Sequence, residues 1–168
     1  MTARKTAKSK GAASTDAIEL LTADHKEVKQ LFKDYDKLVE SEAEDEDKQA
    51  LAAEICAMLS VHTMVEEEIF YPAAREGIDQ QDLLDEAEVE HASAKELIAQ
   101  IEGMEPSEPL YDAKVKVLGE YVNHHVKEEE GEMFPAVKKA KLDLDALGAE
   151  MAERKQALLA EMGMGEEA

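Results

Sequence analysis

Apolar residues recur every three or four positions in four successive segments of this 168-residue chain. These stripes fall within residues 21–35, 51–69, 84–101 and 111–133. A period of this kind places the apolar side chains along one face of a helix. Because the segments between the stripes are short, successive helices are expected to run antiparallel. The sequence therefore predicts an all-α fold, an up-down-up-down four-helix bundle.

The two ends of the chain depart from this pattern. Residues 1–14 contain four basic residues and no acidic one, among Ser, Thr, Ala and Gly, which is typical of a disordered basic tail. Asp16 and Glu19 match a capping box and predict the start of the first helix. We therefore expect the bundle over residues 15–140. A last amphipathic segment predicts an additional C-terminal helix within residues 141–168, packed on the bundle.

Four features mark the expected helix boundaries. The acidic run at residues 41–47 breaks the apolar pattern and predicts the first connection. Gly77 and Gly103 are plausible helix stops. Two prolines in residues 104–109 predict the third connection, with Pro109 near the start of the fourth helix.

Charge and composition exclude several classes of protein. The chain has 40 Asp and Glu against 19 Lys and Arg, which opposes binding to a phosphate backbone, so no nucleic-acid partner is expected. Its apolar runs are shorter than the roughly 18 residues of a membrane span, and its start lacks the apolar segment of a signal peptide. The single cysteine, Cys56, excludes an internal disulfide and favours a reducing compartment. These features predict a cytoplasmic protein without a membrane partner.

An internal repeat relates the second helix to the fourth. His62–Ala73 (HTMVEEEIFYPA) aligns with His125–Ala136 (HVKEEEGEMFPA) at an offset of 63 residues. The histidine, the two glutamates, the proline and the last alanine are identical, and Tyr71 aligns with Phe134. The segments that begin at Asp24 and Glu90 align at an offset of 66 residues. Each copy thus supplies one histidine from its first helix and a His-x3-Glu pair from its second.

Six side chains from this repeat fall at one level of the predicted bundle. At about 1.5 Å per residue they lie within a slab roughly 8 Å thick. They are His25, His62, Glu66, His91, His125 and Glu129. Four imidazoles and two carboxylates in an apolar layer are costly unless they are paired, and a pair of cations would pair all of them.

The residue types indicate which metals suit this site. Two carboxylates are suited to bridging two cations, and four histidines give each cation two nitrogens. With an oxo or hydroxo bridge, each metal keeps a position open for a small molecule. Histidine and carboxylate ligands without thiolates suit iron, and manganese and zinc accept the same ligand types. A metal-free helical bundle whose core histidines are satisfied by hydrogen bonds is the alternative interpretation.

Three neighbouring residues are expected to play other roles. His124 lies about 100° around its helix from His125 and breaks the register of the repeat, so we interpret it as a flanking residue or as one that supports a ligand from outside. Glu67 and Glu130 are repeated, but they point away from the ligand face. They are expected to be solvated or to support the ligands from outside.

Four motifs resemble the haemerythrin-like (HHE cation-binding) family over about residues 16–140: DH at Asp24–His25, HTMVEEEIFYP, EH at Glu90–His91, and HHVKEEEGEMFP. The resemblance implies a four-helix bundle around a non-haem di-iron centre. It implies terminal ligands at His25, His62, His91 and His125. It also implies that Glu66 and Glu129 are the bridging carboxylates.

One position departs from the oxygen-carrying haemerythrins, which have a further histidine where this chain has Lys95. The set of four histidines and two glutamates is similar to bacterial di-iron proteins linked to iron–sulphur cluster repair and nitrosative stress. This sequence lacks the N-terminal cysteine-containing domain common in that group. Neither cluster repair nor reversible oxygen carriage is therefore the expected role.

The sequence thus predicts a non-haem di-iron protein that binds, senses or reacts with a small oxidant. The candidate ligands are O2, hydrogen peroxide and NO, in oxidative or nitrosative stress or in iron homeostasis. Two alternatives stay open. One is a catalase- or peroxidase-like enzyme at the same irons, and the other is an iron-sensing or iron-handling module whose loaded state is read by a protein partner.

Overall fold

The computed structural model describes residues 15–163, and its regular elements within that range are all helical. Three stretches of helix are single elements: α2 (Ala17–Glu40), α5 (Gln81–Glu102) and α8 (Leu144–Glu161). The other two are composite. They are α3 (Asp45–Val65), η1 (Glu66–Phe70) and α4 (Tyr71–Gly77), and then α6 (Tyr111–Glu128), η2 (Glu129–Met133) and α7 (Phe134–Lys139). The basic tail predicted for residues 1–14 lies outside the described residues.

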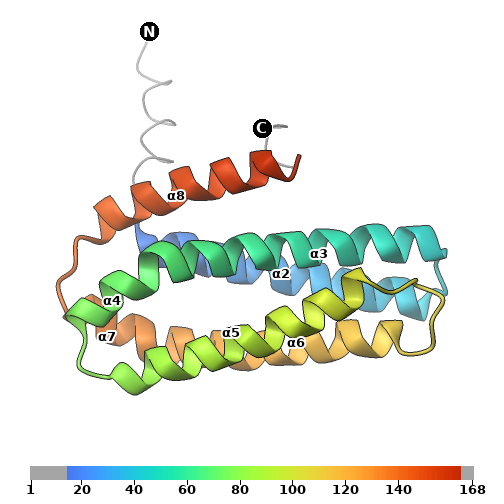
Figure 1. Cartoon of the computed structure of the whole chain (residues 1–168), viewed down its shortest axis with the longest axis horizontal. Helices are drawn as coiled ribbons and strands as arrows, with labels where there is room; N and C mark the ends of the chain where they lie inside the picture. Colours follow the sequence, from blue (N-terminus) through green and yellow to red (C-terminus); the bar gives the residue numbers. More distant parts are fainter. Residues whose placement is uncertain (1–14, 164–168) are drawn as a thin grey trace, which may run out of the picture.

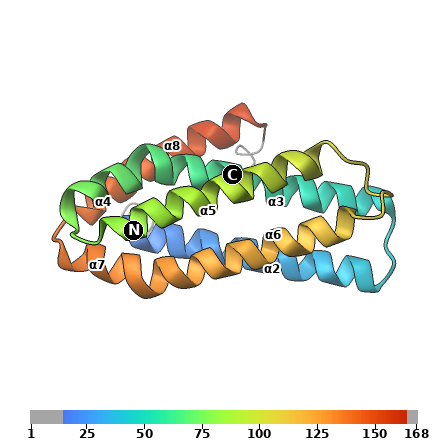
Figure 2. The same ribbon diagram turned by 60° about the horizontal axis from the view of Figure 1, so that its bottom comes forward.

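Four rods of helix run antiparallel and form a closed ring (Figures 1 and 2). In this ring α2 packs on α3, α3 on α5, α5 on α6, and α6 on α2. The predicted all-α, up-down-up-down bundle is therefore confirmed. No helix within residues 15–163 is both long enough and apolar enough to cross a lipid bilayer.

The C-terminal helix α8 lies outside the ring, against α2 and α3 (Figure 1). Met151 and Leu158 bury their side chains in this contact. Gly148 makes the close approach possible, because a Cβ at this position would lie 2.6 Å from the carbonyl oxygen of Thr15. Arg154 adds an ion pair with Glu68, at 2.7 Å between Nε and Oε1.

Local sequence explains where two of the helices begin. The Asp16 carboxylate accepts a hydrogen bond from the Glu19 backbone, and the Glu19 side chain bonds back to the Asp16 N–H, so the predicted capping box is present. The first connection is shorter than predicted, because α3 begins at Asp45, inside the acidic run. Acidic side chains in a first helical turn interact favourably with the positive end of the helix dipole, which accounts for the difference.

Two apolar clusters fill the bundle, one toward each end. The first contains the buried residues Leu21, Phe70, Leu84, Phe134 and Met151. The second contains Tyr35, Ile55, Cys56, Ile101, Tyr111 and Leu118. A layer of buried polar residues carries the candidate metal ligands, and burial in the second cluster raises the pKa of the Cys56 thiol to about 12.

Candidate metal centre

Glu66 and Glu129 each begin a π-helical segment, where the sequence predicted uninterrupted α-helix. The N–H of Tyr71 bonds to the carbonyl of Glu66, and the N–H of Phe134 bonds to that of Glu129. One residue separates each segment from a proline, Pro72 in the first case and Pro135 in the second. Proline has no N–H and its ring clashes with the carbonyl four residues earlier, so a wider turn at this point relieves the conflict. Single π turns of this kind are frequent at functional sites.

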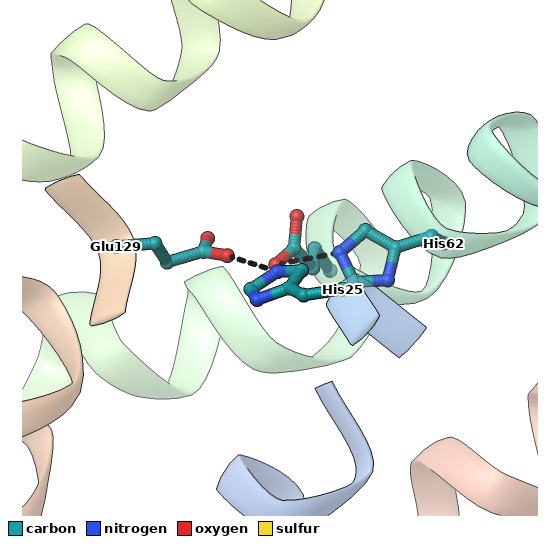
Figure 3. Close-up of side chains that lie close together, drawn as sticks. His25, His62 and Glu129 are labelled. Atoms are coloured by element: carbon teal, nitrogen blue, oxygen red, sulfur yellow. Dashed lines mark ion pairs between the residues drawn. The ribbon is translucent and has the colours of Figure 1, made fainter. Parts of the chain in front are cut away.

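The structure brings together all six side chains that the sequence singled out. Glu66 lies between two histidines, with Oε2 3.2 Å from Nε2 of His62 and Oε1 3.0 Å from Nε2 of His91. Glu129 lies between the other two, with Oε1 3.1 Å from Nε2 of His25 and Oε2 3.3 Å from Nε2 of His125. Figure 3 shows His25, His62 and Glu129 converging from three different helices.

The six side chains form two halves, and each carboxylate contributes one oxygen to each half. The His25/His62 half contains Glu66 Oε2 and Glu129 Oε1, and its four ligand atoms lie within 4.8 Å of one another. All four of these atoms are buried and have no hydrogen-bond partner. The His91/His125 half contains Glu66 Oε1 and Glu129 Oε2.

The donor set fits a pair of cations. A buried polar atom without a partner costs about 1–3 kcal/mol, so four such atoms in one place indicate a missing electron-pair acceptor. A cation in the His25/His62 half would accept electron pairs from all four. The ligands are imidazole nitrogens and carboxylate oxygens without sulfur, which suits iron, manganese or zinc.

Each histidine is held from behind by a carboxylate on its Nδ1, so that Nε2 points into the centre. The Nδ1-to-oxygen distances are 2.7 Å for His25 with Glu130, 3.0 Å for His62 with Asp24, 2.7 Å for His91 with Glu67 and 2.6 Å for His125 with Glu90. Such pairs orient metal-binding histidines and raise their basicity. Glu67 and Glu130 therefore support histidines instead of facing solvent alone.

Asp24 and Glu90 are supporting residues whose role was not predicted from the sequence. The signal for them was present, because an acidic residue directly precedes each first-helix histidine in the repeat. Each of them reaches across to the histidine of the following rod, whose position depends on how the helices are rotated. That rotation is a tertiary feature, so the spacing alone did not pair them.

Two lysines extend this outer layer of carboxylates. Lys95 occupies the position of the extra histidine in oxygen carriers. Its ammonium lies 2.8 Å from Glu67, the carboxylate behind His91. Lys155 of α8 lies 2.6 Å from Asp24, which in turn bonds to His62. Burial by itself raises the pKa of Asp24, but the hydrogen bond and charge of His62 and the Lys155 ammonium outweigh burial and lower it.

The electrostatics of the layer favour charged pairs. Burial by itself lowers the pKa of His62, but the charge of Glu66 and the bond to Asp24 raise it well above 6.5. The pKa of His125 rises to about 10, since bonds to Glu129 and Glu90 outweigh its burial. Conversely, His62 and His91 hold the pKa of Glu66 well below 4.5 despite its complete burial. Without a metal, protonated histidines supply the positive charge that stabilises these carboxylates. A divalent cation would supply that charge instead.

Tyr71 also lies at the centre, although the sequence pattern did not predict it as a site residue. Its hydroxyl donates to Glu129 Oε2 at 2.5 Å and lies 3.0 Å from Glu66 Oε1. The same oxygen is 3.3 Å from Nε2 of His91 and 3.3 Å from Nε2 of His125. Burial and the charges of Glu129 and Glu66 raise the pKa of this phenol well above 10.

Comparison with known proteins identifies the family. The model of the Hemerythrin HHE cation binding domain matches residues 16–137. The chain belongs to this HHE cation-binding family. The crystal structure of a Hemerythrin HHE cation binding domain-containing protein from Mycobacterium kansasii superposes with a TM-score of 0.73, at 27% identity over 87% of this chain and 88% of that one.

A curated relative of this HHE chain is a DNA nickase from Nostoc sp.. The two are 32% identical over 125 residues, which is 71% of this chain. The chain spans about a third, 33%, of the length of that relative.

A small apolar cavity reaches the HHE centre from its histidine side. Its volume is about 50 Å³, and its lining includes all four ligand-candidate histidines with Val28, Leu59, Ile98 and Val122. Among the described residues, Glu66, Glu129 and Tyr71 are not part of this lining. One water needs about 10–15 Å³ of such volume, so the cavity suits a molecule of a few atoms. Lys155 and Leu159 of α8 form part of its wall.

His124 lies outside the centre, as its register indicated. Its side chain is 65% exposed, and its Nε2 lies 3.2 Å from Glu128 and 3.6 Å from Glu90. Burial and the neighbouring Glu90 raise the pKa of Glu128. These three residues form a separate surface cluster, joined to the centre through the bond between Glu90 and His125.

Proposed function

We propose that this HHE protein holds two iron ions in its polar layer and binds, senses or reacts with a small oxidant there. Its four histidines would be terminal ligands and Glu66 and Glu129 would bridge the two ions. The proposal rests on one observation above all, the apolar cavity of about 50 Å³ that is lined by the four histidines. When bound, an iron pair would supply electrons to, or accept electrons from, a molecule in this space.

The surrounding residues define the kind of molecule. The cavity is small, and its surface is mostly apolar although Asp24, Glu90 and Lys155 contribute to its wall, so it favours small uncharged molecules of two heavy atoms. The outer carboxylates hold each imidazole ring in one orientation, with Nε2 toward the centre. O2, NO and hydrogen peroxide therefore fit as ligands, and a role in oxidative or nitrosative stress or in iron homeostasis follows from their chemistry.

A specific observation favours the catalase- or peroxidase-like alternative. Asp24 and Lys155 both contribute to the wall of the cavity, and they bond to each other at 2.6 Å. A carboxylate and an ammonium beside the bound molecule would hold and exchange protons, which peroxide turnover requires. Simple binding of O2 or NO has no such requirement.

Iron loading tests the proposal. Anaerobic titration of the full chain with Fe(II) should bind about two irons per chain, and His62→Ala should bind less. His124→Ala is the matched control, since the exposed neighbour of His125 should leave the stoichiometry unchanged. A folded wild-type chain that takes up no Fe(II) would overturn the proposal.

Peroxide consumption then separates the two activities. The iron-loaded protein is mixed with excess hydrogen peroxide, and O2 release and peroxide loss are followed over many equivalents. Sustained turnover supports the enzyme, whereas consumption that stops at stoichiometry supports binding or sensing. Lys155→Met should slow turnover while the protein keeps its two irons.

A further inference from the structure

Two surface pockets occupy equivalent places in the two copies of the internal repeat. The α5 pocket has a volume of about 580 Å³, and its lining includes Glu67, Arg75, Leu84, Glu88 and Lys95. The α2 pocket has a volume of about 590 Å³, and its lining includes Glu19, Thr22, Lys26, Lys29, Glu130 and Lys138. The repeat aligns Glu67 with Glu130, Lys95 with Lys29 and Arg75 with Lys138. The fold therefore builds one pocket twice, and the charges of the two copies can be compared directly.

The cations of the α5 pocket are paired with acids. The Lys95 ammonium lies 2.8 Å from Glu67, the carboxylate behind His91. The Arg75 guanidinium lies 2.7 Å from Asp85 and 4.0 Å from Glu88. Two cations and two acids line this pocket, so it has no excess of positive charge to offer a ligand.

The three lysines of the α2 pocket are not paired in this way. Within residues 15–163 the lysines that form ion pairs with acids are Lys48, Lys95 and Lys155. Lys29 thus differs from its aligned partner Lys95, because it forms no ion pair with the carboxylate behind the neighbouring histidine. Lys26 stands where the other copy has Ala92, so it adds a third cation to this pocket.

The two acids of the α2 pocket already accept hydrogen bonds from other groups. Glu19 Oε1 accepts from the Asp16 N–H at 3.2 Å, in the capping box. Glu130 Oε2 lies 2.7 Å from Nδ1 of His25, and the Phe134 ring stacks on the His25 ring with 6.0 Å between centroids and an interplanar angle of 3°. The lining therefore has more cations than acids, although the whole chain has a net charge of −21. At physiological salt, charges farther away than about 8 Å are largely screened, so the local excess decides what binds here.

We propose that the α2 pocket binds a small multivalent anion that carries a phosphate group. Lysine ammonium groups bind phosphate as point charges, and the Thr22 hydroxyl adds a hydrogen-bond donor to the lining. The volume of about 590 Å³ falls within the roughly 300–1,000 Å³ of small-molecule sites, so phosphate on an organic body fits as well as free phosphate. The bound anion would lie beside Glu130, one hydrogen bond away from His25. The pocket itself needs no metal.

Isothermal titration calorimetry of the full chain tests the proposal and identifies the source of the phosphate group. The three ligands are inorganic phosphate, ADP and uncharged adenosine, each at low and at high NaCl. Phosphate or ADP should saturate one site per chain, more weakly at high salt because the lysine charges are screened. Tighter binding of ADP assigns an organic phosphate, and binding of phosphate as tight as that of ADP or tighter assigns the free ion. Adenosine that binds as tightly as ADP would overturn the proposal, and so would a wild-type chain that binds neither anion.

Two triple variants locate the site. Lys26→Gln, Lys29→Gln and Lys138→Gln together should weaken binding by about tenfold or more, because hydrogen bonds to charged groups are the strong ones. The matched control combines Lys33→Gln, Lys37→Gln and Lys116→Gln, which removes the same charge from three exposed lysines outside the pocket and should leave most of the affinity. Equal affinities in the two triple variants would overturn the proposal.

His62→Ala separates this pocket from the metal centre. This variant should bind less iron but should bind the anion as tightly as the wild-type chain. Loss of anion binding in it would show that the phosphate had bound to the metal, which would overturn this inference and leave the proposed function standing. A wild-type chain that binds the anion but takes up no Fe(II) would refute the proposed function alone.

Discussion

Removal of the metal should lower the free energy of unfolding of this fold substantially. The four atoms of the His25/His62 half that lack hydrogen-bond partners are buried inside the bundle. At about 1–3 kcal/mol for each unsatisfied atom, their combined cost is at most about 4–12 kcal/mol, because the His25–Glu129 and His62–Glu66 pairs, 3.1 and 3.2 Å apart, offset part of it. A whole domain has a net stability of only about 5–15 kcal/mol. The metal is therefore expected to contribute a large share of the free energy of unfolding.

Even the lower value has a measurable consequence. For a domain of this size each kcal/mol shifts Tm by about 2–4 °C, so Fe(II) loading should raise Tm by about 8–16 °C or more. The assay is anaerobic scanning calorimetry of chelator-treated protein, with and without two equivalents of Fe(II). His124→Ala should show the full shift, and His62→Ala should show little of it. A shift below about 2 °C in wild-type protein that has bound two irons would refute the reasoning.

Two further predictions concern the residues around the ligands. Glu67→Gln removes the carboxylate behind His91 and should weaken iron binding by about 10–100-fold in a competition titration, whereas the exposed Glu132→Gln should not. In chelator-treated protein the raised pKa of His125, about 10, stabilises the fold fully below about 6.5, and this stabilisation is lost as pH rises through about 10. Urea unfolding at intervals from pH 7 to 10 should show a decline that is smaller in His125→Gln, and equal declines in the two proteins would contradict this origin.

The helical period made the fold and the level of the six polar residues predictable. His62 and Glu66 are four residues apart on one helix, so their shared face follows from local geometry alone. The repeat then placed His125 and Glu129 in the same way, and the structure brings all six together. The π turns that begin at Glu66 and Glu129 were not predicted, although Pro72 and Pro135 stand where such turns end.

The contacts between helices could not be predicted from the spacing of residues in the sequence. The bond from Asp24 to His62 and the bond from Lys155 to Asp24 join residues 38 and 131 positions apart. Such pairs depend on how each helix is rotated about its axis and on where α8 docks. Both depend on the packing of many residues at once. At Gly148, for example, α8 lies against the backbone of residues 15–17, where α2 begins.

The sequence by itself determined the class of this protein: an HHE bundle with four histidines and two glutamates at one level. Helical periodicity and an internal repeat can both be recognised from the order of the residues alone. Only the tertiary structure decided that Tyr71 enters one half of the centre while Phe134 closes the other. The aligned residues differ by a single hydroxyl. That hydroxyl lies within 3.3 Å of four atoms from α5, α6 and the two π turns, and the packing of the helices brings these atoms together.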